Sequence, residues 1–127
     1  MPFISFNKAT DPAAPDDLRI NTTAVLYVEA SRPDLLGETT IHMLGQGTTV
    51  NAVTQSIGTV VSEIGSLVAA KRHYLAPPPD GGASTVHIAP WNVSHIRPNL
   101  PLKQDFWYVK FVDGSELRII DPLPEGL

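Results

Sequence analysis

Short runs of β-branched and aromatic residues, separated by polar segments with proline or glycine, dominate the sequence. Such runs are typical of β-strands bounded by turns. The strands expected from them cover Phe3 to Phe6, Ile20 to Ala30, Thr39 to Met43, Thr48 to Ala52, Thr85 to Ile88, Val93 to Ile96, Phe106 to Val112 and Leu117 to Ile120. The pattern predicts an α+β fold that consists predominantly of antiparallel β-structure.

One segment has helical periodicity instead. Its apolar positions at helical spacing are Ile57, Val60, Val61, Ile64 and Val68. Together they form a stripe along one side of a helix. Thr54 or Ser56 can cap its start, and the basic end at Lys71 suits the C-terminal end of a helix dipole. We predict one long amphipathic helix, about residues 54–72, between two hairpin-based halves.

A second stripe of small residues runs beside the first. It consists of Gly58, Ser62, Gly65 and Ala69. Each glycine inside a helix costs roughly 1 kcal/mol relative to alanine, so a close approach of another backbone would offset that cost. The approaching backbone could be this protein's own sheet. The alternative is a two-fold interface between copies, which predicts a homodimer or higher homo-oligomer.

The hairpin before this helix is expected to turn at a four-residue loop, residues 44–47. Its predicted register sets Thr48, Val50 and Ala52 opposite Met43, Ile41 and Thr39. The last hairpin is expected to turn at a three-residue loop, residues 112–114, with Gly114 in the left-handed conformation. This register pairs Val109 with Leu117, Trp107 with Ile119, Phe111 with Ser115, Lys110 with Glu116 and Tyr108 with Arg118.

We expect a single compact domain over residues 1–127. Its first β half and helix would cover residues 1–74, a Pro/Gly linker residues 75–84, and a second β half residues 85–127. The halves also look like an internal repeat. Hydrophobic positions from Ile20 to Met43 match those 68 residues later, and after the turn the offset becomes 67, so that Ala52 matches Ile119.

The stretch from Leu18 to Ile64 contains TTIHMLGQGTTVNAV followed by TQSIGTVVSEI. Its order of strand, hairpin and helix resembles the small FlbD-type module of flagellar and motility proteins, over about a third of the chain. A LytTR-like pattern is also present around residues 25–30. The resemblance implies a strand–hairpin–helix fold and a non-catalytic accessory role.

The composition narrows the function classes. Charged residues make up 17% of the chain, below the roughly 25% usual for soluble domains, which fits either a surface covered by a partner or one rich in Thr, Ser and Pro. A net charge of −4 and scattered basic residues make nucleic acid an unlikely partner. Cysteine chemistry is excluded because there are no cysteines.

With no membrane span or signal pattern, we expect a cytoplasmic protein of a bacterium or an infected host cell.

No pattern of catalytic, metal-binding or cofactor-binding residues is recognisable, so we predict a protein that is not an enzyme and has no metal or cofactor. One low-specificity ligand site is expected on a strand face, formed by Arg97, Tyr108, Lys110 and Arg118. An aromatic ring beside guanidinium groups suits a nucleotide or another planar anion. The alternative is an ordinary cross-strand pair.

The sequence therefore favours a non-enzymatic binding or adaptor protein, in phage or bacterial regulation or counter-defence, that acts as a homo-oligomer on a host protein. Two alternatives stay open. One is a sponge that sequesters a small nucleotide signal at the Tyr/Arg face, and the other is a virion decoration or assembly subunit.

Overall fold

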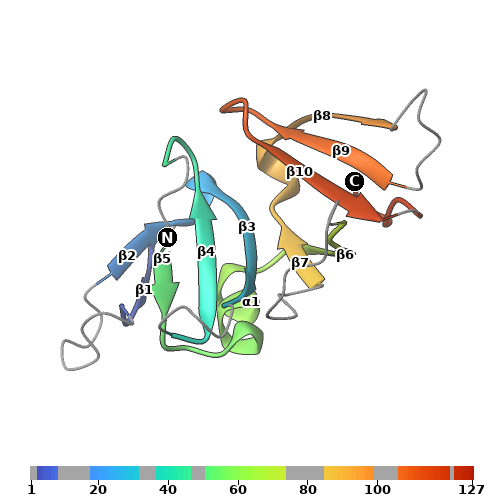
Figure 1. Ribbon diagram of the computed structural model, residues 1–127. Helices are drawn as coiled ribbons and strands as arrows, with labels where there is room; N and C mark the ends of the chain where they lie inside the picture. Colours follow the sequence, from blue (N-terminus) through green and yellow to red (C-terminus); the bar gives the residue numbers. More distant parts are fainter. Residues whose placement is uncertain are drawn as a thin grey trace.

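The computed structural model of the chain describes residues 3–8, 18–31, 37–46, 51–73, 85–98, 106–120 and 122–127. These residues form mostly antiparallel β-sheet, with one α-helix, α1 (Ile57–Ile64), and two 3-10 turns, η1 (Thr22–Ala24) and η2 (Pro90–Asn92) (Figure 1). The strands are β1 (Phe3–Phe6), β2 (Leu18–Asn21), β3 (Val25–Ala30), β4 (Thr39–Met43), β5 (Asn51–Val53), β6 (Val68–Lys71), β7 (Thr85–Ile88), β8 (Val93–Pro98), β9 (Phe106–Phe111) and β10 (Glu116–Ile120). The predicted α+β class with dominant antiparallel structure is confirmed. The predicted linker, residues 75–84, lies outside the described residues.

The strands form three sheets. The largest has five strands in the order β5-β4-β3-β7-β6, and the others are β10-β9-β8 and β1-β2. The five-stranded sheet takes β5, β4 and β3 from before α1 and β7 and β6 from after it. The sheets therefore do not divide at the helix into the two separate hairpin-based halves that the sequence predicts.

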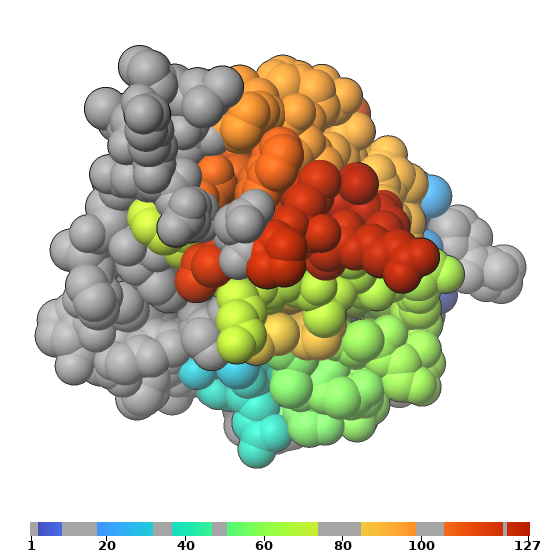
Figure 2. All heavy atoms as spheres, turned by 90° about the vertical axis from the view of Figure 1, so that its right-hand side faces the viewer, coloured from blue at the N-terminus to red at the C-terminus, as the bar shows by residue number. Residues whose placement is uncertain are grey.

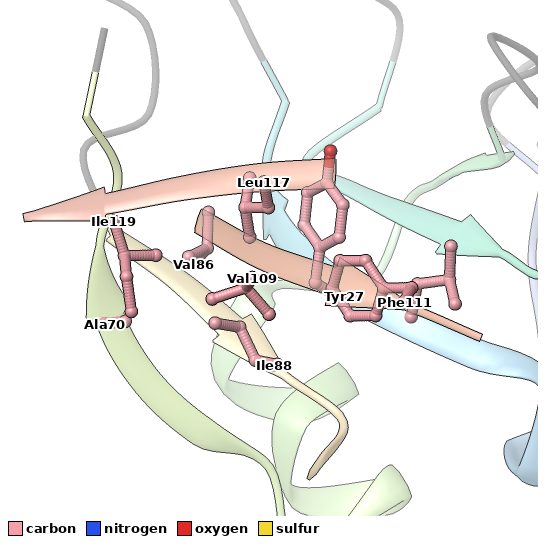
Figure 3. Close-up of a cluster of buried hydrophobic side chains, with 9 residues drawn as sticks. Tyr27, Ala70, Val86, Ile88, Val109, Phe111, Leu117 and Ile119 are labelled. Carbon is pink, nitrogen blue, oxygen red and sulfur yellow. The ribbon is translucent and has the colours of Figure 1, made fainter. Parts of the chain in front are cut away.

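Strand β3 lies between two hydrophobic cores and contributes to both. Val25 and Val28 are fully buried in one core, which β1, β2 and α1 cover. Leu26 and Tyr27 lie in the other core, between the five-stranded sheet and the sheet of β8, β9 and β10. A register shift between Val25 and Tyr27 breaks the strand's strict alternation, so two consecutive side chains belong to the same core. Figure 3 shows Tyr27 among the side chains of this second core.

The helix is much shorter than the predicted residues 54–72. Ser56 caps its start, since its side chain accepts a hydrogen bond from the Thr59 amide (3.3 Å). Gly65 (φ 76°) and Ser66 (φ 58°) have left-handed backbone conformations directly after Ile64, and such residues end a helix. Pairing of the following residues with β7 then overrides their helical periodicity.

This early end removes the predicted helical stripe of small residues. Gly58 and Ser62 are exposed on α1, Gly65 caps it, and Ala69 is exposed on β6. These four residues share no helix face. The expectation of a helix-to-helix interface through them was therefore wrong in its physical basis.

The register of the last hairpin is confirmed at every predicted pair. Val109 pairs with Leu117 and Tyr108 with Arg118, and the Phe111 amide donates to the Ser115 carbonyl (2.9 Å). The turn residue Gly114 has the expected positive φ of 91°. The full set of predicted pairs is Val109–Leu117, Trp107–Ile119, Phe111–Ser115, Lys110–Glu116 and Tyr108–Arg118.

The register of the earlier hairpin differs from the prediction by one residue. Thr39 pairs with Val53 rather than with Ala52. The predicted partners Thr48 and Val50 lie outside the described residues. Val53 is fully buried, and placing valine instead of alanine in the core buries more apolar surface, which favours the observed register.

The tips of the two hairpins are joined by a hydrogen bond. The Gly45 amide donates to Oδ2 of Asp113 over 3.0 Å, and Oδ1 of Asp113 accepts from the Ser115 amide over 2.9 Å. One carboxylate therefore fixes its own turn and also holds the tip of the other hairpin.

Two exposed glycines test how the backbone conformation of a glycine determines the effect of replacing it by alanine. Gly114→Ala should lower the free energy of unfolding by about 1 kcal/mol or more, because alanine is strained at positive φ. Gly58→Ala should raise it by roughly 0.5–1 kcal/mol, because Gly58 is helical. An added Cβ meets nothing within 4 Å at either site, so new side-chain contacts do not contribute to either change in stability. Urea unfolding measures both changes, and effects of the same sign would contradict the prediction.

Candidate functional site

The four predicted site residues lie on one face of the three-stranded sheet. Tyr108 in β9 pairs with Arg97 in β8 on one side and with Arg118 in β10 on the other. Lys110 lies two residues further along β9, so its side chain has the same orientation as that of Tyr108. The opposite face of the sheet carries Val109, Leu117 and Ile119, which pack on the five-stranded sheet. We call the face with Arg97, Tyr108, Lys110 and Arg118 the outer face.

The described side chains of the outer face carry more positive than negative charge. The guanidinium carbon of Arg97 lies 4.1 Å from the centroid of the Tyr108 ring, which is a close cation–π contact. Glu116 is the carboxylate nearby, with Oε2 at 3.8 Å from Arg97 Nη2 and 3.6 Å from Lys110 Nζ. Among the described residues of this face, three cationic side chains are therefore accompanied by one carboxylate, and the Arg97 side chain is 54% exposed. The arrangement can attract an anion.

A pocket of about 400 Å³ lies elsewhere, at the junction of β6 and β10. Its lining is mostly apolar and consists of Ala69, Ala70, Lys71, Thr85, Ile120, Pro122 and Pro124. Figure 2 shows the C-terminal residues, in red, against the yellow-green residues of β6 on this side of the molecule. None of the four predicted site residues lines this pocket.

A second polar cluster lies on the five-stranded sheet, beside the core between the sheets. Its centre is Glu29 of β3, whose side chain is 14% exposed. Glu29 Oε1 lies 3.0 Å from His42 Nε2, and Oε2 accepts a hydrogen bond from Arg72 Nη1 over 2.9 Å. The His42 ring stacks on Tyr27 with 4.1 Å between ring centroids. The carboxylate thus holds together residues from three separate strand regions.

The surroundings of Glu29 favour its ionised form. Burial alone raises the pKa of its carboxyl, but the hydrogen bond with His42 and the charge of Arg72 lower it by more, so the pKa lies below its usual value. An ionised carboxylate in this position stabilises the contact between the region after β6 and the five-stranded sheet.

Sequence reasoning did not find this cluster. The His42 side chain is 22% exposed. No local motif joins Glu29 to Arg72, because they are far apart in the sequence and meet through the pairing of β3 with β7 and of β7 with β6. The sequence gives one indication of the cluster: the acidic residue Glu29 directly follows the apolar run 24–28.

Within the described ranges, no group of three or more His, Asp or Glu side chains is arranged to hold a metal ion. Of the helical residues that the structure describes, none form a segment long and apolar enough to cross a membrane. No family model matches the sequence, and neither the curated proteins nor the solved structures yielded a match.

The Glu29 cluster predicts an acid-sensitive contribution to stability. Because the folded-state pKa is lowered, the contribution is present above the ordinary glutamate pKa of 4.5 and is lost as the pH falls through the folded-state pKa. Glu29→Gln should therefore lower the free energy of unfolding by about 1–2 kcal/mol at pH 7. The difference from the unsubstituted protein should shrink below pH 4.5.

Glu63→Gln is the matched control, since Glu63 is exposed on α1, and it should change little at either pH. Urea unfolding at pH 7 and at acid pH provides the measurement. A Glu29→Gln deficit that stays constant into acid would show that the carboxylate charge does not stabilise the fold.

Proposed function

We propose that this chain is a non-enzymatic binding protein that docks an acidic protein partner on the outer face. The observation that carries the proposal is the cationic group of Arg97, Lys110 and Arg118 around Tyr108, opposed by Glu116 alone among the described side chains of this face. The chain as a whole has a net charge of −4. A local positive face on an acidic protein favours association with a negative surface and steers its approach.

The shape of the site favours a protein over a small molecule. Small ligands bind in concave pockets that bury most of their surface, whereas the outer face is one side of a three-stranded sheet, and its four predicted site residues do not line the pocket at β6 and β10. In addition, Arg97 already covers the Tyr108 ring. Sequestration of a nucleotide stays the second candidate, because the Arg97–Tyr108 contact could open to stack a base.

We also infer that the chain consists of two copies of one strand unit. Support comes from the strand registers: Val25 pairs with Met43 and Val28 with Ile41, and Val93 with Phe111 and Ile96 with Val109, all 68 residues later. Both strand pairs have a register shift after the first pair, between Val25 and Tyr27 and between Val93 and His95.

The hairpin partners refine the expected offset. Ile41 pairs with Asn51 and Val109 with Leu117, so the offset after the turn is 66 rather than the predicted 67. The earlier hairpin therefore has two extra residues, which agrees with its one-residue change of register.

Loss of one charge tests the proposed function. Fluorescence anisotropy would measure binding of a labelled poly-glutamate peptide at low and at physiological salt. Arg97→Ser should weaken binding roughly two- to fivefold, the size expected for an exposed ion pair. The matched control Lys71→Ser removes one charge at an exposed position of β6 and should leave the affinity unchanged.

A parallel titration uses ATP and a cyclic dinucleotide as probes. Binding of nucleotide without binding of the acidic peptide would favour sequestration of a nucleotide. Binding of neither probe, or an equal effect of both substitutions, would contradict a binding site for anions on the outer face.

A further inference from the structure

The second edge of β3 is paired with a strand from a later part of the chain. Tyr27 pairs with Ile88, Val28 with His87 and Glu29 with Val86. The pairing brings β7 from beyond α1 onto the edge of β3 that β4 leaves open. The Ala89 amide extends the contact by donating to the Leu26 carbonyl over 2.9 Å.

A polar clamp from η2 secures this joint. Asn92 Nδ2 donates to the carbonyl oxygens of Thr23 and Val25, both at 2.7 Å. Trp91 Nε1 donates to the Thr22 carbonyl over 3.1 Å. These bonds satisfy carbonyl groups at the start of β3, so the added strand and the turn after it act as one unit.

Strand β8 is the counterpart of β3, because its pairs with β9 repeat those of β3 with β4 at the offset of 68. The two strands differ at the other edge. Within the described ranges no strand pairs with the second edge of β8, which ends the order β10-β9-β8. An open edge presents unpaired backbone groups that can bind an extended segment. Figure 1 shows β8 at the outside of the molecule.

The charges at the two edges are opposite. On β3, Glu29 pairs with Thr40 of β4 and Val86 of β7, and Arg72, which follows β6, donates to its carboxylate over 2.9 Å. On β8 the corresponding residue is Arg97, paired with Tyr108. Because β8 has the cation Arg97 where β3 has the anion Glu29, a segment added at β8 would meet a positive charge, which favours an acidic segment.

We propose that β8 binds an extended acidic segment of a partner protein as an additional strand, with a carboxylate of that segment beside Arg97. The inference rests on the proposed function and specifies its mode of binding. Backbone hydrogen bonds to β8 supply affinity, and Arg97 and Lys110 select the charge. Pro98 has no amide hydrogen, so it limits the strand to the residues before it.

A second copy of this chain is a poorer occupant of the same edge. The strand that corresponds to β7 is β2, and its partner β1 is followed by Lys8, which would take the place of Arg72, as their matching bridges to Val53 and Ile119 indicate. Lys8 would then approach Arg97, and like charges repel. Thr23 and Ala24 also occupy the places of Trp91 and Asn92 and cannot supply the same clamp.

The test compares two peptides of identical charge. One is a labelled peptide of alternating Glu and Val, and the other carries N-methyl groups on every second amide, which removes donors needed for strand pairing. Anisotropy should show that methylation weakens binding roughly tenfold or more, because at least two hydrogen bonds are lost. Amide hydrogen exchange of β8 should slow with the unmethylated peptide only.

Charge reversal provides the second measurement. Arg97→Glu recreates the carboxylate found at Glu29, so it should abolish binding of the Glu/Val peptide and permit binding of a Lys/Val peptide. Lys71→Glu, a reversal of equal size at an exposed position of β6, should keep the original preference. The reversal therefore separates charge selection at β8 from the total charge of the protein.

The outcomes separate the two proposals. Equal binding of both Glu/Val peptides would overturn strand addition while leaving an anion-binding outer face intact. Binding of neither peptide would overturn both. Light scattering that shows self-association of the unsubstituted protein, abolished by competing Glu/Val peptide, would assign the edge to a second copy and overturn the acidic partner.

Discussion

The pairing of β3 with β7 is the interaction on which the rest of the fold depends. It joins strands from before and after α1 into one sheet, and that sheet then separates the two hydrophobic cores. Because β3 is bonded at both edges and buried on both faces, its residues have little freedom to vary. Glu29 tolerates burial there because the pairing of β3 with β4 holds His42 beside it, and the pairings of β3 with β7 and of β7 with β6 bring Arg72 to it.

Local features of the sequence were enough to predict the last hairpin completely. Asp113 and Gly114 define the turn, and alternation of apolar and charged residues leaves one register with consistent faces. The earlier hairpin lacked such a constraint, since Ala52 and Val53 are both apolar and either could face the core. The helix was overextended for a related reason. Val68 fits helical spacing, but its pairing with Ile88 in β7 decides its conformation.

The two polar sites also differ in how far the sequence alone could predict them. The position of Tyr108, Lys110 and Arg118 on one face was predictable because the register of β9 and β10 follows from their turn. Arg97 joins them through the pairing of β8 with β9. The cluster around Glu29 was not, because the position of Arg72 depends on strand pairings between distant segments. Charge distinguishes the two faces as well. The counterpart of Glu29 in the repeated registers is Arg97, so one strand arrangement supports both a closed internal contact and an exposed cationic surface.

The order of the strands along the chain has a consequence for synthesis on the ribosome. β3 and its partner β4 emerge early, but β7 follows only after α1 and residues 74–84 have been translated. Throughout that interval the nascent chain has an open strand edge and lacks the second core, which needs Val109, Phe111, Leu117 and Ile119 from the C-terminal strands. Such intermediates are prone to aggregate or to recruit chaperones. A premature stop codon before residue 85 would leave the product in that state permanently.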